Sequence, residues 1–313
     1  MAAGHGHGHG HGHAAAQGTA TGGHRRRLML VLLFTASVLV VQVVGAIASG
    51  SLALLADAGH MAADSAGIVL SLVAVTLAQR APTSRRTFGW QRAEILAAAA
   101  NAVVLFALAL YILVEAVRRF SEPPEVASGL MLVVALVGLA ANTASLLLLH
   151  RAQSDSLNLR GAYLEVLGDL LGSVAVVVAA LVITLTGWQR ADAVASGLVA
   201  LMILPRAWGL LREAIDVLLE AVPRGVDIGA VRHHITHVPG VVDVHDLHAW
   251  TITSGLPVLS AHVVVDEVTM AGGHTGRVLD ELCTCLAGHF DVEHSTFQIE
   301  SATHREHESP VHD

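Results

Sequence analysis

The second long apolar run of the sequence contains polar side chains that such runs rarely carry. Its segment ADAGHMAAD, residues 56–64, includes His60 and Asp64, and a later run includes Glu165 and Asp169. Residues four apart lie on one face of a helix, so each pair could hold one ion. Imidazole and carboxylate groups are common ligands of divalent metals. The spacing predicts a metal site between two helices.

The two pairs share a pattern that extends to a glycine three residues further on, Gly67 in one run and Gly172 in the other. An ionised carboxylate inside a bilayer costs at least a few kcal/mol and usually has a partner. Neither run has an arginine or lysine in its core, which predicts that a mobile cation neutralises the site. The alternative is a set of polar contacts between packed helices.

Composition places these helices in a membrane. The chain has 313 residues, of which 53% are hydrophobic and 14% charged, and its mean hydropathy is +0.60. Ordinary soluble domains do not need such a balance. Cys283 and Cys285 are too few for a disulfide framework, and we interpret them as reduced cytosolic thiols, with a metal role as the alternative.

Six runs are long enough to span a bilayer at about 20 residues each. They cover about 28–48, 52–78, 93–117, 126–149, 161–186 and 192–219, within a transport domain at 28–220. Six spans put both termini on one side. The cluster Arg25–Arg27, which closes a His-rich leader at 1–27, favours the cytoplasm for that side, and hence a multi-pass protein of the plasma (inner) membrane.

A soluble module follows Pro223. Its apolar pattern predicts the order αββαβ at 221–300, with a disordered His-rich tail at 301–313. From Ala221 onward there are 4 Arg and 13 acidic residues, a net charge of 4 − 13 = −9. Burial of this pattern requires a small sheet covered by helices, which predicts a compact ferredoxin-like α+β domain in the cytoplasm.

Four segments in this order resemble the cation diffusion facilitator family. They are SGSLALLADAGHMAADSAG, then FGWQRAEILAAAAN at 88–101, GDLLGS at 168–173 and HDLHAW at 245–250. The resemblance covers about residues 28–300. It implies a homodimeric exporter that moves Zn²⁺ out of the cytoplasm in exchange for protons, with the transport site at His60, Asp64 and Asp169.

Glu165 departs from the resemblance, because zinc-type members commonly have histidine there. A carboxylate makes the site harder and more anionic, so Mn²⁺, Fe²⁺, Co²⁺ or Cd²⁺ are less easily rejected. Zinc remains the favoured ion, since His60 suits an oxygen-only manganese site poorly. We further hypothesise that His60, assisted by Glu165, takes up protons as the metal leaves, because ligands must be deprotonated to coordinate.

The resemblance also implies metal ions in the soluble domain. The matching positions are His245, His262 and Glu300, with His294 as a fourth. Gln298 stands where some members have histidine, and the alternative is that His248 and His262 are ordinary strand histidines. Bound metal would offset part of the acidic charge and make the domain a sensor of metal load.

Other segments allow two interpretations each. The alternating leader, with His5 to His13, and the tail HREHESPVH could collect metal, although the leader could also be a cloning artefact. Asp57 could line the exit path or cap its helix. Arg92 and Glu94 could form a charge latch between helices, or Trp90 and Arg92 could anchor the membrane interface.

Two further function classes compete with transport. An intramembrane metalloprotease would need an open metal position and typically H-E-x-x-H, which the sequence lacks. A sensor that does not transport would have no use for ligands at membrane depth. We therefore expect a secondary transporter rather than an enzyme, whose partners are a second copy, lipid and protons, and not nucleic acid.

Overall fold

The computed structural model describes residues 22–150, 157–290 and 294–307, with the backbone alone at 22–35, 157–162 and 287–289. The predictions for the His-rich leader and for most of the tail lie outside these residues. Six long helices come first in the described part of the chain. They are α1 (Gly22–Ser49), α2 (Leu52–Ala78), α3 (Ala93–Ser121), α4 (Ser128–His150), α5 (Leu157–Thr186) and α6 (Arg190–Leu218).

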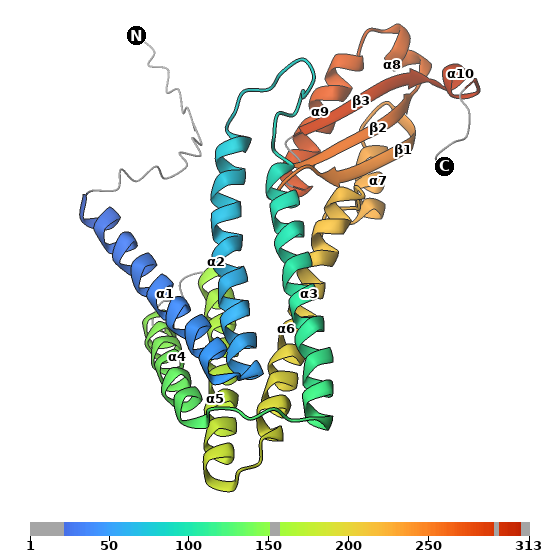
Figure 1. Ribbon diagram of the computed structural model, residues 1–313. Helices are drawn as coiled ribbons and strands as arrows, with labels where there is room; N and C mark the ends of the chain where they lie inside the picture. The colour runs from blue at the N-terminus through green and yellow to red at the C-terminus, as the bar shows by residue number, and fades with distance from the viewer. Residues whose placement is uncertain (1–21, 151–156, 291–293, 308–313) are drawn as a thin grey trace.

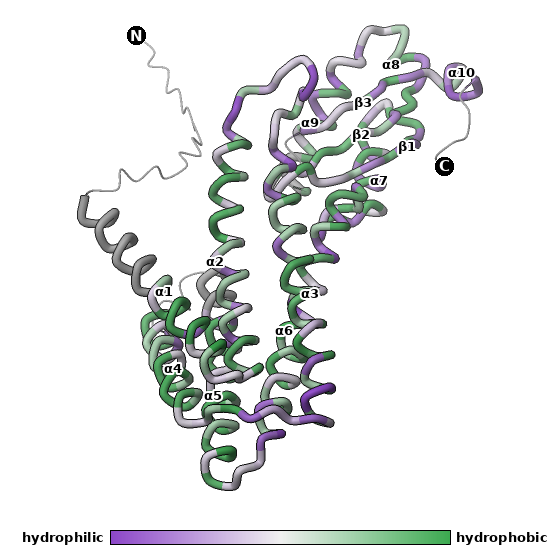
Figure 2. Tube along the Cα trace, viewed as in Figure 1, coloured by the Kyte–Doolittle hydropathy of each residue, from purple (hydrophilic) through white to green (hydrophobic). Residues whose placement is uncertain are grey.

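Hydrophobic residues predominate along the helices of this bundle (Figure 2). Five helices are long and apolar enough to cross a membrane, and α1 adds a shorter apolar stretch, Ala36–Ser49, among the residues with described side chains. Large side chains such as Leu148 and Leu185 are 79% and 81% exposed. A surface of this kind is stable only in lipid, so the predicted multi-pass membrane protein is confirmed.

Small residues let the helices approach closely. Ala102, Ala109 and Ala116 recur every seven residues along α3 and are buried against α6, where Ala200 and Ala207 are also buried. Lipid tails are as apolar as leucine, so close van der Waals contact between such small residues contributes much of the packing energy in membranes.

The start of α2 is held by a side chain from another helix. Ser51 is the N-cap residue, and Asp192 at the start of α6 accepts hydrogen bonds from the Ser51 hydroxyl (2.5 Å) and from the backbone N–H groups of Leu52 (2.8 Å) and Ala53 (3.2 Å). These bonds satisfy donors that a helix N-terminus leaves unpaired. Asp57 therefore does not cap the helix, and that interpretation is wrong.

The C-terminal domain lies at the end of the bundle where α6 finishes and α3 begins (Figure 1). Its elements are α7 (Ile228–Thr236), β1 (Val241–Thr251), β2 (Pro257–Val265), α8 (Glu267–Ala271), α9 (Thr275–Phe290), β3 (His294–Ser301) and α10 (Ala302–Arg305). The sheet has the order β1-β2-β3, antiparallel between β1 and β2 and parallel between β2 and β3. The predicted αββαβ order is confirmed, with α8 and α10 as short additions.

The two faces of this sheet have different environments. Leu259, Ala261 and Val263 of β2 alternate along the strand and are buried in a core with residues of α7 and α9, such as Val231 and Leu282. Because successive side chains of a strand point to opposite faces, His262 must point away from that core. Polar side chains such as His262 therefore gather on the face of the sheet opposite α7 and α9.

Among the described residues, two polar contacts lie where the bundle meets the domain. Arg92, just before α3, donates to Glu220 beyond α6 (2.7 Å), and the Thr253 hydroxyl of the domain donates to Glu94 (2.7 Å). The charged pair of the FGWQRAEIL segment thus contacts two different partners on the domain side. The Arg86 guanidinium lies over the Trp90 ring, with its central carbon 3.7 Å from the ring centroid.

Candidate metal sites

The first candidate site lies inside the bundle, between α2 and α5. His60 Nε2 is 3.0 Å from Asp169 Oδ1 and 3.4 Å from Asp64 Oδ2. One ligand atom from each of these residues lies within 4.8 Å of the others, and His60 is buried at 6% exposure. Two oxygens and one nitrogen at this separation can bind a single divalent ion after small side-chain movements.

A cavity of about 200 Å³ opens beside these ligands. Its lining comes from α2, α5 and α6, and consists of Asp57, His60, Leu164, Glu165, Gly168, Asp169, Gly172, Val199, Met202, Ile203 and Arg206. The cavity can hold a hydrated ion, and its polar lining includes carboxylates from both helices that carry the predicted pairs.

Glu165 has a partner that the sequence reasoning did not anticipate. Arg206 of α6 donates a hydrogen bond to the Glu165 carboxylate, and its guanidinium is 3.9 Å from Asp64 Oδ1. The expectation that only a mobile cation neutralises the site is therefore wrong, because a third helix supplies a fixed one. The run at 192–219 contains two arginines, Arg206 and Arg212, and comparison of the two carboxylate-bearing runs alone could not reveal that one of them meets the site.

Asp57 lies at the meeting point of several helices. It is 4% exposed, lines the cavity, and accepts a hydrogen bond from Gln42 of α1 (2.8 Å). Gln42 Oε1 and His60 Nδ1 are buried and have no hydrogen-bond partner among the described residues. The Gln42 oxygen can accept a hydrogen bond from a water, and the His60 nitrogen can bind a proton or a water.

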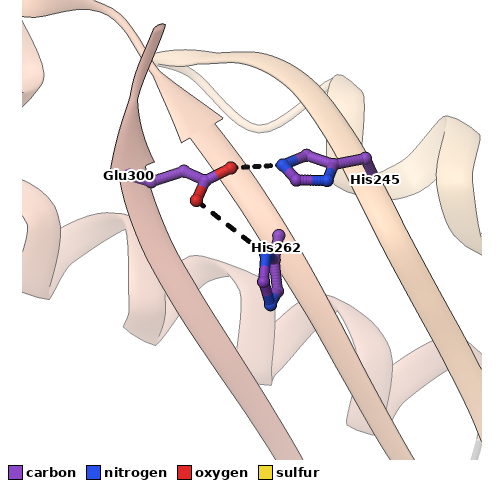
Figure 3. A group of neighbouring side chains, drawn as sticks. All are labelled: His245, His262 and Glu300. Carbon is purple, nitrogen blue, oxygen red and sulfur yellow. Dashed lines mark hydrogen bonds and ion pairs between the residues drawn. The ribbon is translucent and has the colours of Figure 1, made fainter. Parts of the chain in front are cut away.

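The second candidate site lies on the face of the sheet opposite α7 and α9. His245 and Glu300 are hydrogen-bonded to each other, and His262 Nδ1 is 3.8 Å from Glu300 Oε2 (Figure 3). His245 pairs directly with His262 across β1 and β2, while an irregularity in β1 begins after His245. Glu300 is only 3% exposed, and a buried carboxylate facing two imidazoles fits a cation well.

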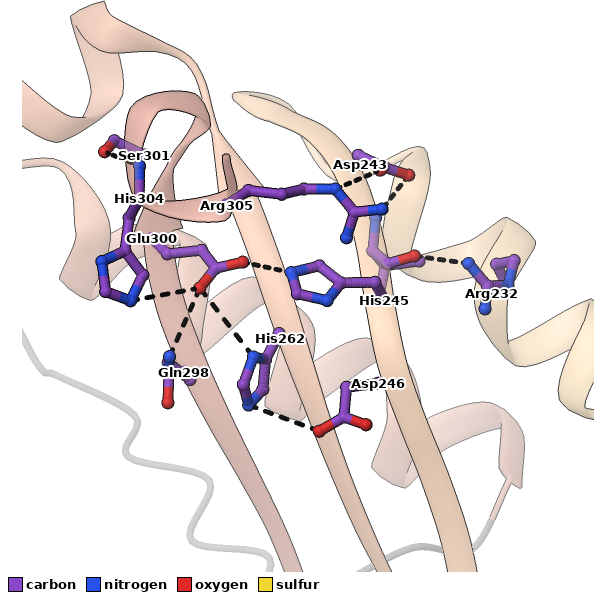
Figure 4. Close-up of polar contacts among 11 residues, drawn as sticks. Arg232, Asp243, His245, Asp246, His262, Gln298, Glu300, Ser301, His304 and Arg305 are labelled. Carbon is purple, nitrogen blue, oxygen red and sulfur yellow. Dashed lines mark hydrogen bonds and ion pairs between the residues drawn. The ribbon is translucent and has the colours of Figure 1, made fainter. Parts of the chain in front are cut away.

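Several polar residues surround this cluster (Figure 4). Asp246 Oδ2 is 3.6 Å from His262 Nε2, Gln298 donates to Glu300 (3.3 Å), and His304 Nε2 is 4.0 Å from the same carboxylate. The sequence reasoning missed Asp246 and His304, because the strand irregularity and the helix α10 that position them leave no periodic signal.

His294 is not part of the cluster. It is the first residue of β3, six residues before Glu300, which corresponds to about 20 Å along a strand. Its ring contacts Phe88 edge-on, with centroids 6.0 Å apart. His294 therefore cannot share an ion with His262 and Glu300 of the same chain.

The cysteines lie outside both clusters. Cys285 Sγ is 3.4 Å from His234 Nδ1, whereas Cys283 is exposed and 3.9 Å from the Ser295 hydroxyl. Both thiols belong to α9, but Cys285 contacts α7 and Cys283 contacts β3. Residues two apart on a helix point in different directions, which agrees with these separate contacts. Neither belongs to a group of three metal-binding side chains among the described residues.

Both parts of the chain match family models. Residues 28–219 match the cation efflux transmembrane domain, and residues 223–302 match the cytoplasmic domain of cation efflux proteins. The chain belongs to the cation efflux family, which comprises secondary transporters rather than enzymes. The resemblance to the cation diffusion facilitators is thereby confirmed.

Individual relatives are similar over most of their length. The cation efflux system protein CzcD of Alcaligenes sp. (strain CT14) is 46% identical over 88% of this chain and 86% of its own. The zinc transporter ZitB of Escherichia coli (strain K12) is 43% identical, with 85% and 84% covered, and the cadmium, cobalt and zinc/H(+)-K(+) antiporter of Bacillus velezensis is 40% identical, with 85% of each chain covered. A solved metal-bound C-terminal domain of the CzcD transporter from Cupriavidus metallidurans is 44% identical and covers 24% of this chain and 99% of that one, with a TM-score of 0.22.

Proposed function

We propose that this chain exports Zn²⁺ from the cytoplasm in exchange for protons. The observation that carries the proposal is the cluster of His60, Asp64 and Asp169 beside a cavity inside a bundle of membrane helices. Relatives at 43% and 40% identity are named a zinc transporter and a cadmium, cobalt and zinc/H(+)-K(+) antiporter. A divalent cation is the substrate that best satisfies buried carboxylates at this depth.

The proposed ligands come from two helices. His60 and Asp64 of α2 and Asp169 of α5 provide one nitrogen and two carboxylates, and Glu165, one turn from Asp169, is the fourth ligand residue. Zinc prefers four such ligands in a tetrahedral arrangement, so this set fits the ion. Because the ligands lie on separate helices, a relative movement of α2 and α5 would change the affinity of the site.

Proton exchange follows from competition for the same atoms. His60 binds metal only as neutral imidazole, and each carboxylate binds it only when ionised. A proton arriving from the outer side therefore favours release of the ion, and an ion arriving from the cytoplasm favours release of protons. The same groups carry both fluxes in opposite directions.

The C-terminal domain is proposed to bind a regulatory ion through His245, His262 and Glu300. The donor set of two imidazoles and one buried carboxylate fits zinc or a similar ion, with Asp246 within reach of His262. When bound, the ion would supply positive charge to an acidic domain. The protein is further proposed to act as a homodimer in the inner membrane, with both termini in the cytoplasm.

A broader cation specificity is the second candidate. Glu165 adds a hard oxygen donor to the cavity, and one relative is named for cadmium and cobalt as well as zinc. Oxygen donors discriminate less against Mn²⁺, Co²⁺ and Cd²⁺ than imidazole does. In this case zinc is one of several substrates of the same site.

Flux measurement in proteoliposomes with an imposed pH gradient tests both candidates. Zn²⁺, Cd²⁺ and Mn²⁺ are run in parallel on the wild type and on Glu165→His. Gradient-driven flux that is selective for zinc in the wild type supports the first candidate. Broad flux that narrows to zinc in the variant supports the second, and metal flux that ignores the pH gradient contradicts proton exchange.

A further inference from the structure

We propose that Arg206 is a tethered counter-cation of the transport site, which occupies the carboxylates when the metal is absent and is displaced when the metal binds. The inference rests on the proposed function of His60, Asp64 and Asp169. It assigns to Arg206 a positioning role, in which the residue sets metal affinity and release through Glu165 and Asp64. Three features of the structure carry it.

The first feature is the set of contacts that the arginine makes. Its guanidinium is hydrogen-bonded to Glu165 and lies 3.9 Å from Asp64 Oδ1, and so bridges the two helices that carry the ligand pairs. His60 meanwhile contacts Asp169 through Nε2 at 3.0 Å. Every predicted ligand thus has an internal partner, and an incoming ion must displace these partners.

The second feature is the balance of charge. Four carboxylates line or adjoin the cavity, from Asp57, Asp64, Glu165 and Asp169. Among the described side chains, Arg206 is the one permanent cation in the cavity lining. A guanidinium stays protonated at any physiological pH, so its charge does not depend on titration of the site. Without it, the empty site would hold up to four negative charges at membrane depth, which is costly.

The third feature is the position of Arg206 and its freedom to move. Along the chain, α2 runs toward the end of the bundle that carries the C-terminal domain, and α5 runs away from that end (Figure 1). Asp64 therefore lies one turn nearer to the domain than His60, and Glu165 one turn nearer than Asp169. Arg206 contacts Asp64 and Glu165, so it covers the domain side of the site. It also follows Pro205, which lacks the N–H of a normal helical hydrogen bond and loosens the backbone there, and its side chain is 35% exposed.

The expected behaviour is competition between two cations. A divalent ion entering from the domain side displaces the guanidinium from Glu165 and Asp64, and the guanidinium returns to them after the ion has left on the far side. Arg206 therefore weakens metal binding and speeds metal release. After release it neutralises the carboxylates again, so that the empty site can return to face the domain side. A merely structural arginine would instead strengthen binding by holding Glu165 in place.

The test compares Arg206→Gln with the wild type in the full-length protein, in metal titrations and in Zn²⁺ flux measurements. Removal of a positive charge beside the ligands should tighten Zn²⁺ binding at the bundle site by about tenfold or more. The KM for Zn²⁺ and the maximal flux should both fall, because release becomes slow. Arg206→Lys keeps the charge and should restore most of both values, and Arg212→Gln, at an exposed position of the same helix, should change neither.

A second test combines Arg206→Gln with a change at Glu165, so that the conclusion does not rest on Arg206→Gln alone. In a Glu165→Gln background the guanidinium has lost its main partner, so the further change Arg206→Gln should tighten binding much less than it does alone. Unchanged or weaker Zn²⁺ binding in Arg206→Gln overturns the inference while leaving the proposed function intact. Absence of Zn²⁺ binding and flux in the wild type instead rejects the proposed function itself.

Discussion

His60 contacts a carboxylate from each of two helices, which makes it the residue through which α2 and α5 meet at the proposed site. Its Nε2 is 3.0 Å from Asp169 and 3.4 Å from Asp64, while its Nδ1 has no partner among the described residues. A buried imidazole with one unpartnered nitrogen is uncommon in a structural role. The geometry favours a group that exchanges its partners during a cycle.

Asp169→Asn tests the need for charge at the proposed transport site. The amide has nearly the same shape but no negative charge, so we expect Zn²⁺ flux to fall at least about a hundredfold. Titration of the full chain should still detect Zn²⁺ binding at the proposed site of the C-terminal domain. Asp216→Asn, on α6 and outside the cavity lining, is the matched control and should retain flux. Normal flux in Asp169→Asn would contradict the assignment.

Gln298→His tests the proposed metal site of the domain by adding a ligand. Gln298 lies in register with His262 and donates to Glu300, so an imidazole there adds a nitrogen donor beside the same cluster. We expect Zn²⁺ affinity at the domain site to rise about tenfold or more. Thr296→His, two residues earlier on the same face of β3, should have little effect. Equal gains in both variants would indicate non-specific histidine binding.

At the scale of elements, Asp192→Ala tests how α6 fixes the start of α2. The change removes a buried acceptor of three hydrogen bonds, from the Ser51 hydroxyl and the N–H groups of Leu52 and Ala53. Leaving these donors unpaired should lower the free energy of unfolding by about 2–4 kcal/mol. Thermal unfolding in detergent measures the loss. Asp192→Asn keeps one acceptor oxygen and should lose less, and an unchanged melting temperature in both variants would show that the cap contributes little.

The long helices could be predicted from sequence because about 20 consecutive apolar residues leave few other structures. The strands of the C-terminal domain could be predicted because their apolar residues alternate, as Leu259, Ala261 and Val263 do. The i, i+4 pairs within α2 and α5 indicated which side chains share a face. In each case the signal is local, and the structure agrees with it.

What could not be predicted depends on contacts between elements. Arg206 meets Glu165 only because α6 packs beside α5, and no spacing within one helix encodes that contact. Asp246 faces His262 because β1 is irregular just after His245, at a residue with φ of 49°. The same limit applies to His294. Its residue type suits a metal ligand, but its position on β3, six residues before Glu300, keeps it away from the cluster.

At the scale of the whole molecule, the bundle and the C-terminal domain are joined near the start of α3 and the end of α6. Arg92 donates to Glu220, and Glu94 accepts from Thr253 of the domain. The arginine and Glu220 are 38% and 57% exposed, and an exposed ion pair contributes little to stability, about 0–1 kcal/mol. The contact is therefore better suited to aligning the two parts than to holding the fold together.

Arg92→Glu tests this alignment, because it places two carboxylates opposite each other at Glu220. We expect Zn²⁺ flux to fall several-fold while the affinity of both metal sites and the melting temperature stay close to those of the wild type, since neither site touches the pair. The exchange Arg92→Glu with Glu220→Arg restores opposite charges and should recover flux. Flux and affinity are measured on the same proteoliposome preparations. Equal loss of flux in the single and the exchanged variants would mean that the ion pair does not couple the domain to transport. Recovery of flux in the exchanged variant would show that the contact between the two charges carries the coupling.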